Sequence, residues 1–183
     1  MRAHGDVSRL IDDIYAAGED PSLWPRFLDD ISDTVGSKMT VLLHQDREQR
    51  ATVSSGVRID PEWVRLYQDH YAAKNIFFIE GKADIYPGSI VLDSCISEQR
   101  LLASEYYNDF LAPQDARYSA GIIIFMEGGR MSLLSTMRSR EAGPFEEAEV
   151  RLLHTLRPHL QRSCQIHRRL FEAERRADLT EAA

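Results

Sequence analysis

Cysteine and histidine are sparse in this sequence, and neither is arranged as a metal site. The 183 residues include only two cysteines, Cys95 and Cys164, which do not form a CxxC pair. This arrangement excludes a disulfide framework and a cysteine-based zinc site, so we expect both side chains to be packed thiols. His154 and His159 lie five positions apart, which points them to different sides of a helix. The sequence therefore predicts no metal site and no cofactor.

Long apolar runs are also missing. No window approaches the roughly 18 uninterrupted apolar residues that a membrane-spanning helix needs. The N-terminal stretch MRAHGDVSRL has no apolar core of the kind found in secretory signals. From these absences we expect a cytoplasmic protein that does not contact a membrane.

The common catalytic motifs are missing as well. The sequence contains no G-x-S-x-G, H-E-x-x-H, G-x-G-x-x-G or P-loop pattern. Adjacent acids such as Asp12-Asp13 and Glu146-Glu147 diverge when they lie on a helix, so we expect them to be solvated. The sequence thus predicts that the chain is not an enzyme and has no catalytic residues.

Positive charge is in deficit. The formal net charge is -7, and such a field repels nucleic acid, because each neutralised phosphate needs a local cation. Arginines recur between Arg151 and Arg176, but acids such as Glu147 and Glu172 are interspersed around them. This mixture is typical of a solvated helix face. We therefore expect any contact with DNA to be made by another segment.

Two segments at the N-terminal end show apolar residues at helical spacing. They cover residues 7–17 and 24–35, and Asp6 is placed to cap the first. The second contains Pro25, which lacks an amide hydrogen and fits only near the start of a helix. This position favours Ser22 as the N-cap.

Five short runs of β-prone residues are bounded by turn residues. They cover residues 39–44, 51–54, 89–92, 120–125 and 131–136. A charged turn follows the first run, and Gly128-Gly129, which supplies positive φ angles, separates the last two. We therefore expect two hairpins.

Two helical patterns lie between the hairpins. One begins at Pro61, and the other begins behind Ser97 as its N-cap and continues to Pro113. Between them, residues 76–78 form a dense apolar cluster that we place in a loop or at a helix end.

A long helical pattern extends from Phe145 to about Ala177, with Pro144 suited to the first helical position. Pro158 removes one backbone hydrogen bond within it and predicts a kink or a break. An apolar stripe at three- and four-residue steps suits a second copy of the chain. The stripe consists of Leu153, Leu156, Leu160, Cys164, His167 and Phe171.

This order of elements predicts an α+β fold, with an antiparallel sheet flanked by helices and a long C-terminal helix. Sensory folds of the GAF and PAS kind have this layout. We expect residues 1–143 to form the sensory, ligand-binding domain and residues 144–183 to form a helix for signalling and dimerisation.

Three aromatic residues lie along one face of the helix that begins at Pro61. Trp63, Tyr67 and Tyr71 each combine a large apolar surface with one polar tip, the composition of a small-molecule pocket with few directed hydrogen bonds. The alternative is that the same residues form the core, with the tyrosine hydroxyls at its rim. Spacing alone favours this alternative and leaves the pocket open as a second interpretation.

The run EWVRLYQDHYAAKNIFF, residues 62–78, resembles the acyl-homoserine-lactone-binding domain of LuxR-type regulators. In that family a Trp, a Tyr four residues later and a following Asp-Pro line the ligand pocket, and Trp63 and Tyr67 match in type and spacing. Where the family has Asp-Pro, this chain has Asn75-Ile76. The carboxylate that accepts the ligand's amide hydrogen is thus replaced by a neutral amide.

Nearly the whole chain is similar to a broader group of LuxR-type regulators, through runs such as SEYYNDFLAPQDARYSAG and LLHTLRPHLQRS. In those proteins a helix-turn-helix domain that binds DNA follows the long helix. Only EAERRADLTEAA follows Phe171, which leaves no room for such a domain. We therefore expect either an excised sensor domain or a protein that has lost its DNA-binding half.

The resemblance implies a ligand-sensing regulatory domain of a LuxR-type transcriptional regulator. We expect a homodimer that binds a small, largely apolar effector and signals to a DNA-binding domain outside this chain. The alternative is a ligand-free scaffold that only dimerises the regulator. The candidate ligand-binding residues are Trp63, Tyr67, Tyr71, Asn75, Phe78, Tyr86 and Tyr107.

Overall fold

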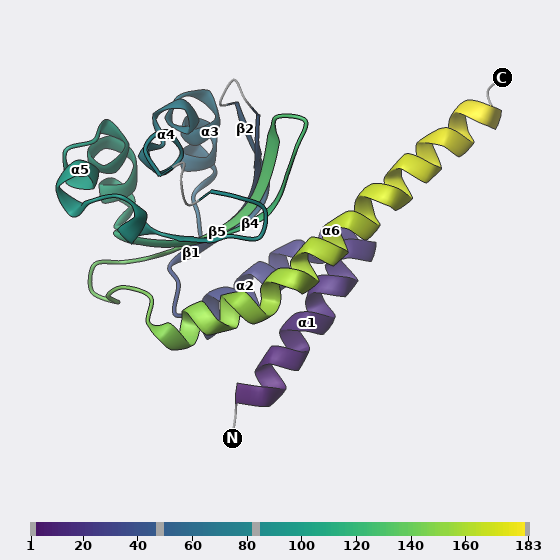
Figure 1. Ribbon diagram of the computed structural model, residues 1–183, viewed down its shortest axis with the longest axis horizontal. Helices are drawn as coiled ribbons and strands as arrows, with labels where there is room; N and C mark the ends of the chain where they lie inside the picture. Colours follow the sequence, from purple (N-terminus) through teal and green to yellow (C-terminus); the bar gives the residue numbers. More distant parts are fainter. Residues whose placement is uncertain (1–2, 47–49, 82–84, 182–183) are drawn as a thin grey trace.

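The structure is a computed structural model that describes residues 3–46, 50–81 and 85–181, with side chains described over 7–46, 50–81 and 85–166. Its centre is one five-stranded antiparallel sheet with helices on both faces (Figure 1). The strand order is β2-β1-β5-β4-β3. The strands are β1 (Met39–Gln45), β2 (Ala51–Val57), β3 (Ile90–Leu92), β4 (Tyr118–Glu127) and β5 (Arg130–Arg138). The predicted α+β fold is confirmed.

Both predicted hairpins are present. β1 pairs with β2, and β4 pairs with β5. Gly128 and Gly129 form the second turn with φ angles of +58° and +83°, a region that side chains with a Cβ rarely adopt. Each β4–β5 and β1–β2 ladder contains one irregularity in register, which adds local twist to the sheet.

Three helices cover one face of the sheet: α1 (Ala3–Glu19), α2 (Trp24–Thr34) and α6 (Glu147–Glu181). In Figure 1 they lie together below the sheet. Their apolar sides meet Leu42, Ile122 and Leu134 of the sheet, and all three of these side chains are buried. The result is a helix-and-sheet core that is closed on this side.

Shorter elements cover the opposite face, above the sheet in Figure 1. Leu43, Ile123 and Leu133, each adjacent in sequence to a residue of the first core, face this layer. Strand alternation therefore divides the sheet between two cores. The covering elements are α3 (Pro61–Asp69), η2 (Tyr71–Lys74), α4 (Ile76–Ile79), η4 (Asp93–Cys95), α5 (Glu98–Leu102), η5 (Tyr106–Leu111) and η6 (Ala112–Gln114).

The caps of the first two helices differ from the prediction. Asp6 lies inside α1 and does not cap it. Ser22 is not the cap of α2 either, because a 3-10 turn, η1 (Pro21–Leu23), precedes that helix. The carboxylate of Asp20 accepts the backbone N–H of Ser22 at 3.0 Å and caps this turn. Pro25 lies in the first turn of α2, as its missing amide hydrogen requires.

The single helix predicted from Ser97 to Pro113 is wrong. Ser97 does act as an N-cap, but α5 ends at Leu102 and a π-helical turn, η5, begins at Tyr106. Between them, the Ser104 hydroxyl donates to the carbonyl of Leu101 at 2.7 Å and accepts the N–H of Tyr107 at 3.1 Å. These local bonds take the place of the regular helical hydrogen bonds between α5 and η5.

The long C-terminal helix is present, but two details differ. Pro144 is not its first residue, since α6 begins at Glu147 and the carbonyl of Pro144 accepts a bond from Arg138 Nη1 at 2.8 Å. Of the two alternatives predicted at Pro158, the break does not occur, because α6 continues through it, and the kink stays a prediction. The carbonyl that loses its partner belongs to His154, which is exposed, so water can take the place of the missing donor.

No helix within the described residues combines the length and the apolar composition that crossing a bilayer would require. The long helix α6 fails this test because charged residues recur along it.

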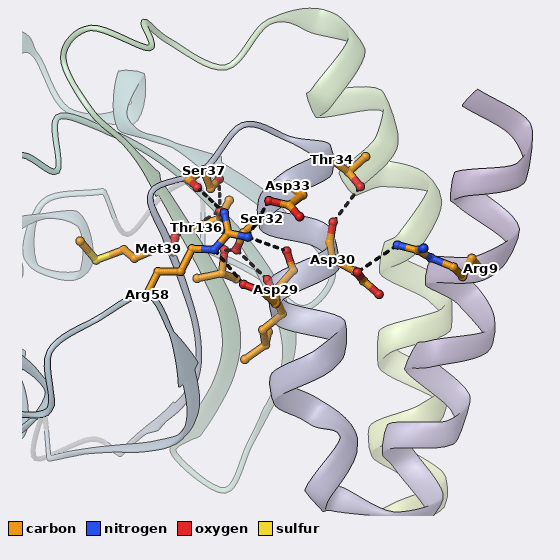
Figure 2. Close-up of polar contacts among 12 residues, drawn as sticks. Arg9, Asp29, Asp30, Ser32, Asp33, Thr34, Ser37, Met39, Arg58 and Thr136 are labelled. Atoms are coloured by element: carbon orange, nitrogen blue, oxygen red, sulfur yellow. Dashed lines mark hydrogen bonds and ion pairs between the residues drawn. The ribbon is translucent and has the colours of Figure 1, made fainter. Parts of the chain in front are cut away.

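A chain of buried hydroxyl groups fixes α2 on the sheet (Figure 2). Ser32 Oγ donates to the carbonyl of Leu28 at 2.6 Å and lies 2.7 Å from Thr40 Oγ1 of β1. Thr40 in turn lies 2.9 Å from Thr136 Oγ1 of β5, which also contacts the hydroxyl of Ser37. Because every member is buried and has a partner, a slipped register would leave polar groups unsatisfied.

Arg58, directly after β2, forms ion pairs with exposed carboxylates of α2 (Figure 2). It has a φ of +58°, and its guanidinium donates to Asp29 at 2.8 Å and to Asp33 at 2.6 Å. The hydrogen bonds to these two carboxylates raise the pKa of Arg58. Because the carboxylates are exposed, the pairs position the strand more than they stabilise the fold.

The helices α1 and α6 approach each other closely at Gly18. A Cβ at this position would lie 2.0 Å from Ser163 Oγ of α6. Ser163 is buried, and its hydroxyl donates to the carbonyl of Ile14 at 2.7 Å, which crosslinks the two helices. Only glycine fits this crossing without a displacement.

We predict that Gly18→Ala lowers the free energy of unfolding, measured by urea denaturation, by about 1–3 kcal/mol through overpacking. This loss outweighs the roughly 0.5–1 kcal/mol that alanine normally contributes over glycine in a helix. The control is the same change in a Ser163→Ala background, where the clashing oxygen is gone. Equal losses in the two backgrounds would contradict the crossing described here.

Candidate ligand-binding site

A cavity of about 70 Å³ lies between the sheet and the layer formed by α3, α4 and η5. One enclosed water needs roughly 10–15 Å³, so the space admits several waters or a small organic molecule. Its walls are predominantly apolar. The lining residues are Met39, Val41, Leu43, Val53, Ile59, Val64, Tyr67, Asn75, Phe77, Phe78, Val91, Tyr106, Phe110, Ser119, Ala120, Gly121, Ile123, Leu133, Ser135 and Met137.

Phe110 is the centre of the aromatic wall. Its ring stacks on Tyr106 with centroids 5.3 Å apart and lies 5.6 Å from the ring of Tyr67. Trp63 and Tyr71 pack against the same ring at 5.7 and 4.8 Å. Rings held by several neighbours at these distances keep a fixed arrangement. The wall can therefore stay open without collapsing into the space beside it.

Asn75 organises the polar end of the cavity. It is 5% exposed and caps α4, because its Oδ1 accepts the backbone N–H of Phe77 at 3.1 Å. Its Nδ2 donates to the hydroxyl oxygens of Tyr67 and Tyr106, both at 3.2 Å. One buried amide thus joins two tyrosines that come from different elements of the layer.

The cavity is electrically neutral at physiological pH. Burial raises the pKa of Tyr67 to about 12, with the hydrogen bond from Asn75 acting in the opposite direction. Burial also raises the pKa of Tyr106 well above its ordinary value. Among the described residues that line the space there is no Asp, Glu, Lys, Arg or His. The site favours an uncharged occupant, since a buried charge would have no counter-ion.

The structure brings three of the predicted ligand-binding residues to the cavity wall: Tyr67, Asn75 and Phe78. Trp63 and Tyr71 are half-buried and pack on the aromatic wall without lining the space. Both rings therefore support the ring of Phe110, which lines the cavity. Contact of the first three with a ligand remains a prediction.

Tyr86 and Tyr107 lie away from the cavity. Tyr86 is 60% exposed. Tyr107 is buried but does not line the cavity, and its hydroxyl accepts a hydrogen bond from Arg140 Nη2 at 3.4 Å. Their aromatic chemistry alone made them candidates, and the fold directs them elsewhere.

Several lining residues were not among the candidates. Tyr106 and Phe110 are four positions apart in η5, and that spacing is visible in the sequence. Ser119 and Ser135 belong to β4 and β5, where they are small residues among larger apolar ones. Small residues on the inner face of a strand leave space, which is the signal that could have identified them.

The stripe predicted to face a second copy packs inside the chain instead. Leu153, Leu156 and Leu160 have no exposed surface and belong to the core that α6 shares with α1 and the sheet. Cys164 packs against the same core, and burial raises the pKa of its thiol to about 12. The side chains of His167 and Phe171 lie outside the described part of α6.

Metal ligation has no support in the described residues. No group of three or more His, Cys, Asp or Glu side chains lies close enough there to hold a metal ion. Cys95 and Cys164 are both partly buried thiols.

Solved structures with a similar fold include a ligand-binding domain and a transcription factor. The ligand-binding domain of VqsR from Pseudomonas aeruginosa superposes with a TM-score of 0.69 at 16% identity, covering 90% of this chain and 94% of that one. CepR2 from Burkholderia cenocepacia, a LuxR-family transcription factor dependent on N-acylhomoserine lactone, gives 0.58 at 14% identity, covering 86% and 96%.

A third similar structure is the GAF domain of an Acinetobacter phosphoenolpyruvate-protein phosphotransferase. Its TM-score is 0.56 at 15% identity, with 88% of this chain and 91% of that chain covered. No protein-family model and no curated protein sequence matches the chain. At these identities the likeness shows the fold alone, which this chain shares with the three structures.

We predict that the free energy of unfolding falls as the pH rises above about 10, the ordinary pKa of tyrosine. The reason is that Tyr67 stays protonated in the folded state up to a pKa of about 12, whereas the unfolded chain loses that proton earlier. Its contribution is complete below pH 10 and is lost as the pH approaches 12. Urea titrations at pH 9, 10 and 11 measure this slope.

In Tyr67→Phe the slope between pH 9 and 11 becomes shallower, because one late-titrating group is gone. Tyr86→Phe is the matched control, since its ring is exposed in the folded protein. A slope that changes equally in the two variants would contradict the burial of the Tyr67 hydroxyl.

Proposed function

We propose that this chain is a ligand-sensing regulatory domain of a LuxR-type transcriptional regulator. A small, largely apolar molecule occupies the cavity between the sheet and the aromatic wall. Its presence changes the packing of α6, which passes the signal to a DNA-binding domain. The observation that carries the proposal is the apolar cavity with one polar end, closed by Tyr67, Asn75 and Tyr106.

The similar structures support this proposal. The similar structure from VqsR is a ligand-binding domain, and CepR2 is a transcription factor that depends on a small molecule. The cavity in this chain has the composition of a small-molecule site, with apolar walls and few directed polar groups. Its volume of about 70 Å³ is small against the roughly 300–1,000 Å³ of sites for drug-sized ligands, so a larger guest would expand it.

The sheet offers a direct path from the cavity to α6. On β4, Ile123 faces the cavity, and the next residue, Ile124, faces the helices. Gln161 of α6 donates to the carbonyl of Ile124 at 3.0 Å, and Arg157 donates to the carbonyl of Gly88 at 3.0 Å. A guest that displaces β4 therefore changes the contacts that seat α6. For this, the ligand needs only to bind one arrangement of the helix more tightly than the other.

Dimerisation belongs to the proposal as well. Because the leucine stripe of α6 is covered within the chain, a second copy would meet other faces of α1 and α6. Ile166 is one apolar side chain that α6 leaves exposed, at 39%. Native mass spectrometry reads the number of chains in the same measurement that detects a ligand.

We expect native mass spectrometry of the protein from its own cells to show a retained small molecule as added mass. Ser135→Leu should lose that mass, because the larger side chain fills the space next to β5. Ser94→Leu makes the same replacement at an exposed position in η4 and should keep it. Both variants should remain folded by circular dichroism.

The bare chain mass alone under gentle conditions would count against sensing. If Ser135→Leu also lost about 1–3 kcal/mol of stability, the centre would be packed and the replacement would overfill it. That pair of results would favour the ligand-free dimerisation scaffold.

A further inference from the structure

A surface cleft lies beside the cavity, and the two spaces share an aromatic side chain. The cleft has a volume of about 610 Å³ and is lined by the end of β1, the β4–β5 turn and α4. Phe78 of α4 lines both the cleft and the cavity. Its ring therefore separates a space that is open to solvent from the interior space.

Phe78 is the least restrained of the aromatic rings on the cavity wall. The rings of Tyr67, Tyr106 and Phe110 pack against one another. Phe77 packs against Tyr106 with ring centroids 6.3 Å apart. All four of these side chains are buried, whereas Phe78 is half-buried. Within the described part of the chain, no aromatic ring packs against Phe78.

The backbone of Phe78 is held in place, so its ring can move without a movement of α4. The N–H of Phe78 donates to the carbonyl of Asn75 at 3.0 Å, and the side chain of Asn75 caps the helix. A change of rotamer about the Cα–Cβ bond is then sufficient to displace the ring. Such changes are fast for side chains that are partly exposed.

A second groove also reaches a residue of the cavity wall, but that residue is held more firmly. The groove has a volume of about 240 Å³, and Tyr106 lines both the groove and the cavity. Tyr106 is 1% exposed, stacks on Phe110 and accepts a hydrogen bond from Asn75. Arg100 Nε also donates to the carboxylate of Glu80 at 3.1 Å, which joins the two sides of this groove.

The cleft beside Phe78 suits the same class of molecule as the cavity. Methionine side chains are flexible and adapt to guests of different shape. Acidic and basic side chains both occur around the cleft, so it does not favour an ion of one sign. The apolar side chains of the cleft are Phe78, Ile85, Met126 and Met131.

We propose that this cleft is the entrance to the cavity and that the ring of Phe78 is its gate. A neutral, largely apolar molecule first lies against Met126 and Met131, and it passes inward when Phe78 changes rotamer. The inference rests on the proposed sensing function, because it requires that the cavity takes up a molecule. Phe78 then controls how fast the cavity exchanges its occupant.

Rate constants distinguish a gate from a wall. A residue that only contacts the guest changes mainly the dissociation rate constant. A residue on the path changes the association and dissociation rate constants by the same factor, because the free and bound states are unaltered. Fluorobenzene is the probe, since it is a neutral apolar ring whose fluorine signal reports exchange. Fluorine exchange NMR on the full chain gives both rate constants, and their ratio gives the dissociation constant.

Met126→Trp tests the entrance without a change in the cavity wall. Met126 is 42% exposed and lines the cleft but not the cavity. Because the larger ring fills the cleft, we expect both rate constants to fall by about tenfold, with the dissociation constant unchanged. Ile79→Trp is the matched control. Ile79 is also 42% exposed, but it lines the groove beside Tyr106, so both rate constants should stay the same.

Phe78→Leu tests the gate itself. The smaller side chain leaves the path partly open, so we expect both rate constants to rise by about tenfold. Phe77→Leu is its control, because Phe77 lines the cavity but not the cleft, and it should change mainly the dissociation rate constant. Circular dichroism checks that each variant is folded. If Phe78→Leu does not fold, the comparison of Met126→Trp with Ile79→Trp still decides the entrance.

The possible results separate the entrance from the sensing function. If Ile79→Trp slows exchange and Met126→Trp does not, the guest enters beside Tyr106 and the proposal is overturned. If Phe78→Leu accelerates dissociation alone, Phe78 is a wall residue and the gate is overturned. If fluorobenzene does not bind the unmodified chain, the cavity takes up no apolar guest, and the sensing function fails together with this inference.

Discussion

Strand β5 has to bury both of its faces, and the rest of the molecule follows from this constraint. Leu134 and Leu133 are adjacent on the strand, and they belong to opposite cores. One core is closed by long helices whose regular surfaces pack tightly, down to the contact between Gly18 and Ser163. The other is covered by short helices and single helical turns, such as α4 and η5. The cavity lies on the side where the covering elements are short.

The parts of the fold that the sequence predicts are those determined by local physics. Alternation of apolar residues and the positive φ angles available to Gly128-Gly129 identify the strands and the second hairpin. The helical spacing from Trp63 to Tyr67 places the tyrosine inward, and the structure has it at the cavity wall. Such signals depend on neighbours in the chain, so they are readable without the tertiary structure.

The remaining features depend on partners that are distant in the sequence. A leucine stripe on α6 shows that a face is buried, but not whether α1 or a second copy buries it, and here α1 and the sheet do. The π-helical turn that brings Tyr106 and Phe110 to the site follows from hydroxyl bonds of Ser104, which compete with a helix of ordinary pattern. The polar end of the site likewise joins partners that are distant in the sequence, because the amide nitrogen of Asn75 donates to the hydroxyl of Tyr106, 31 positions later.

Because α6 is long, a small tilt at its base produces a larger displacement at its far end. The helix is seated on the body through Leu160 and Ser163, and its last turns extend away from the sheet in Figure 1. At 1.5 Å per residue, the stretch from Cys164 to Glu181 extends about 25 Å, so a tilt of about 5° at its base moves its tip by about 2 Å. A small repacking at the base of α6 therefore becomes a larger displacement at its end.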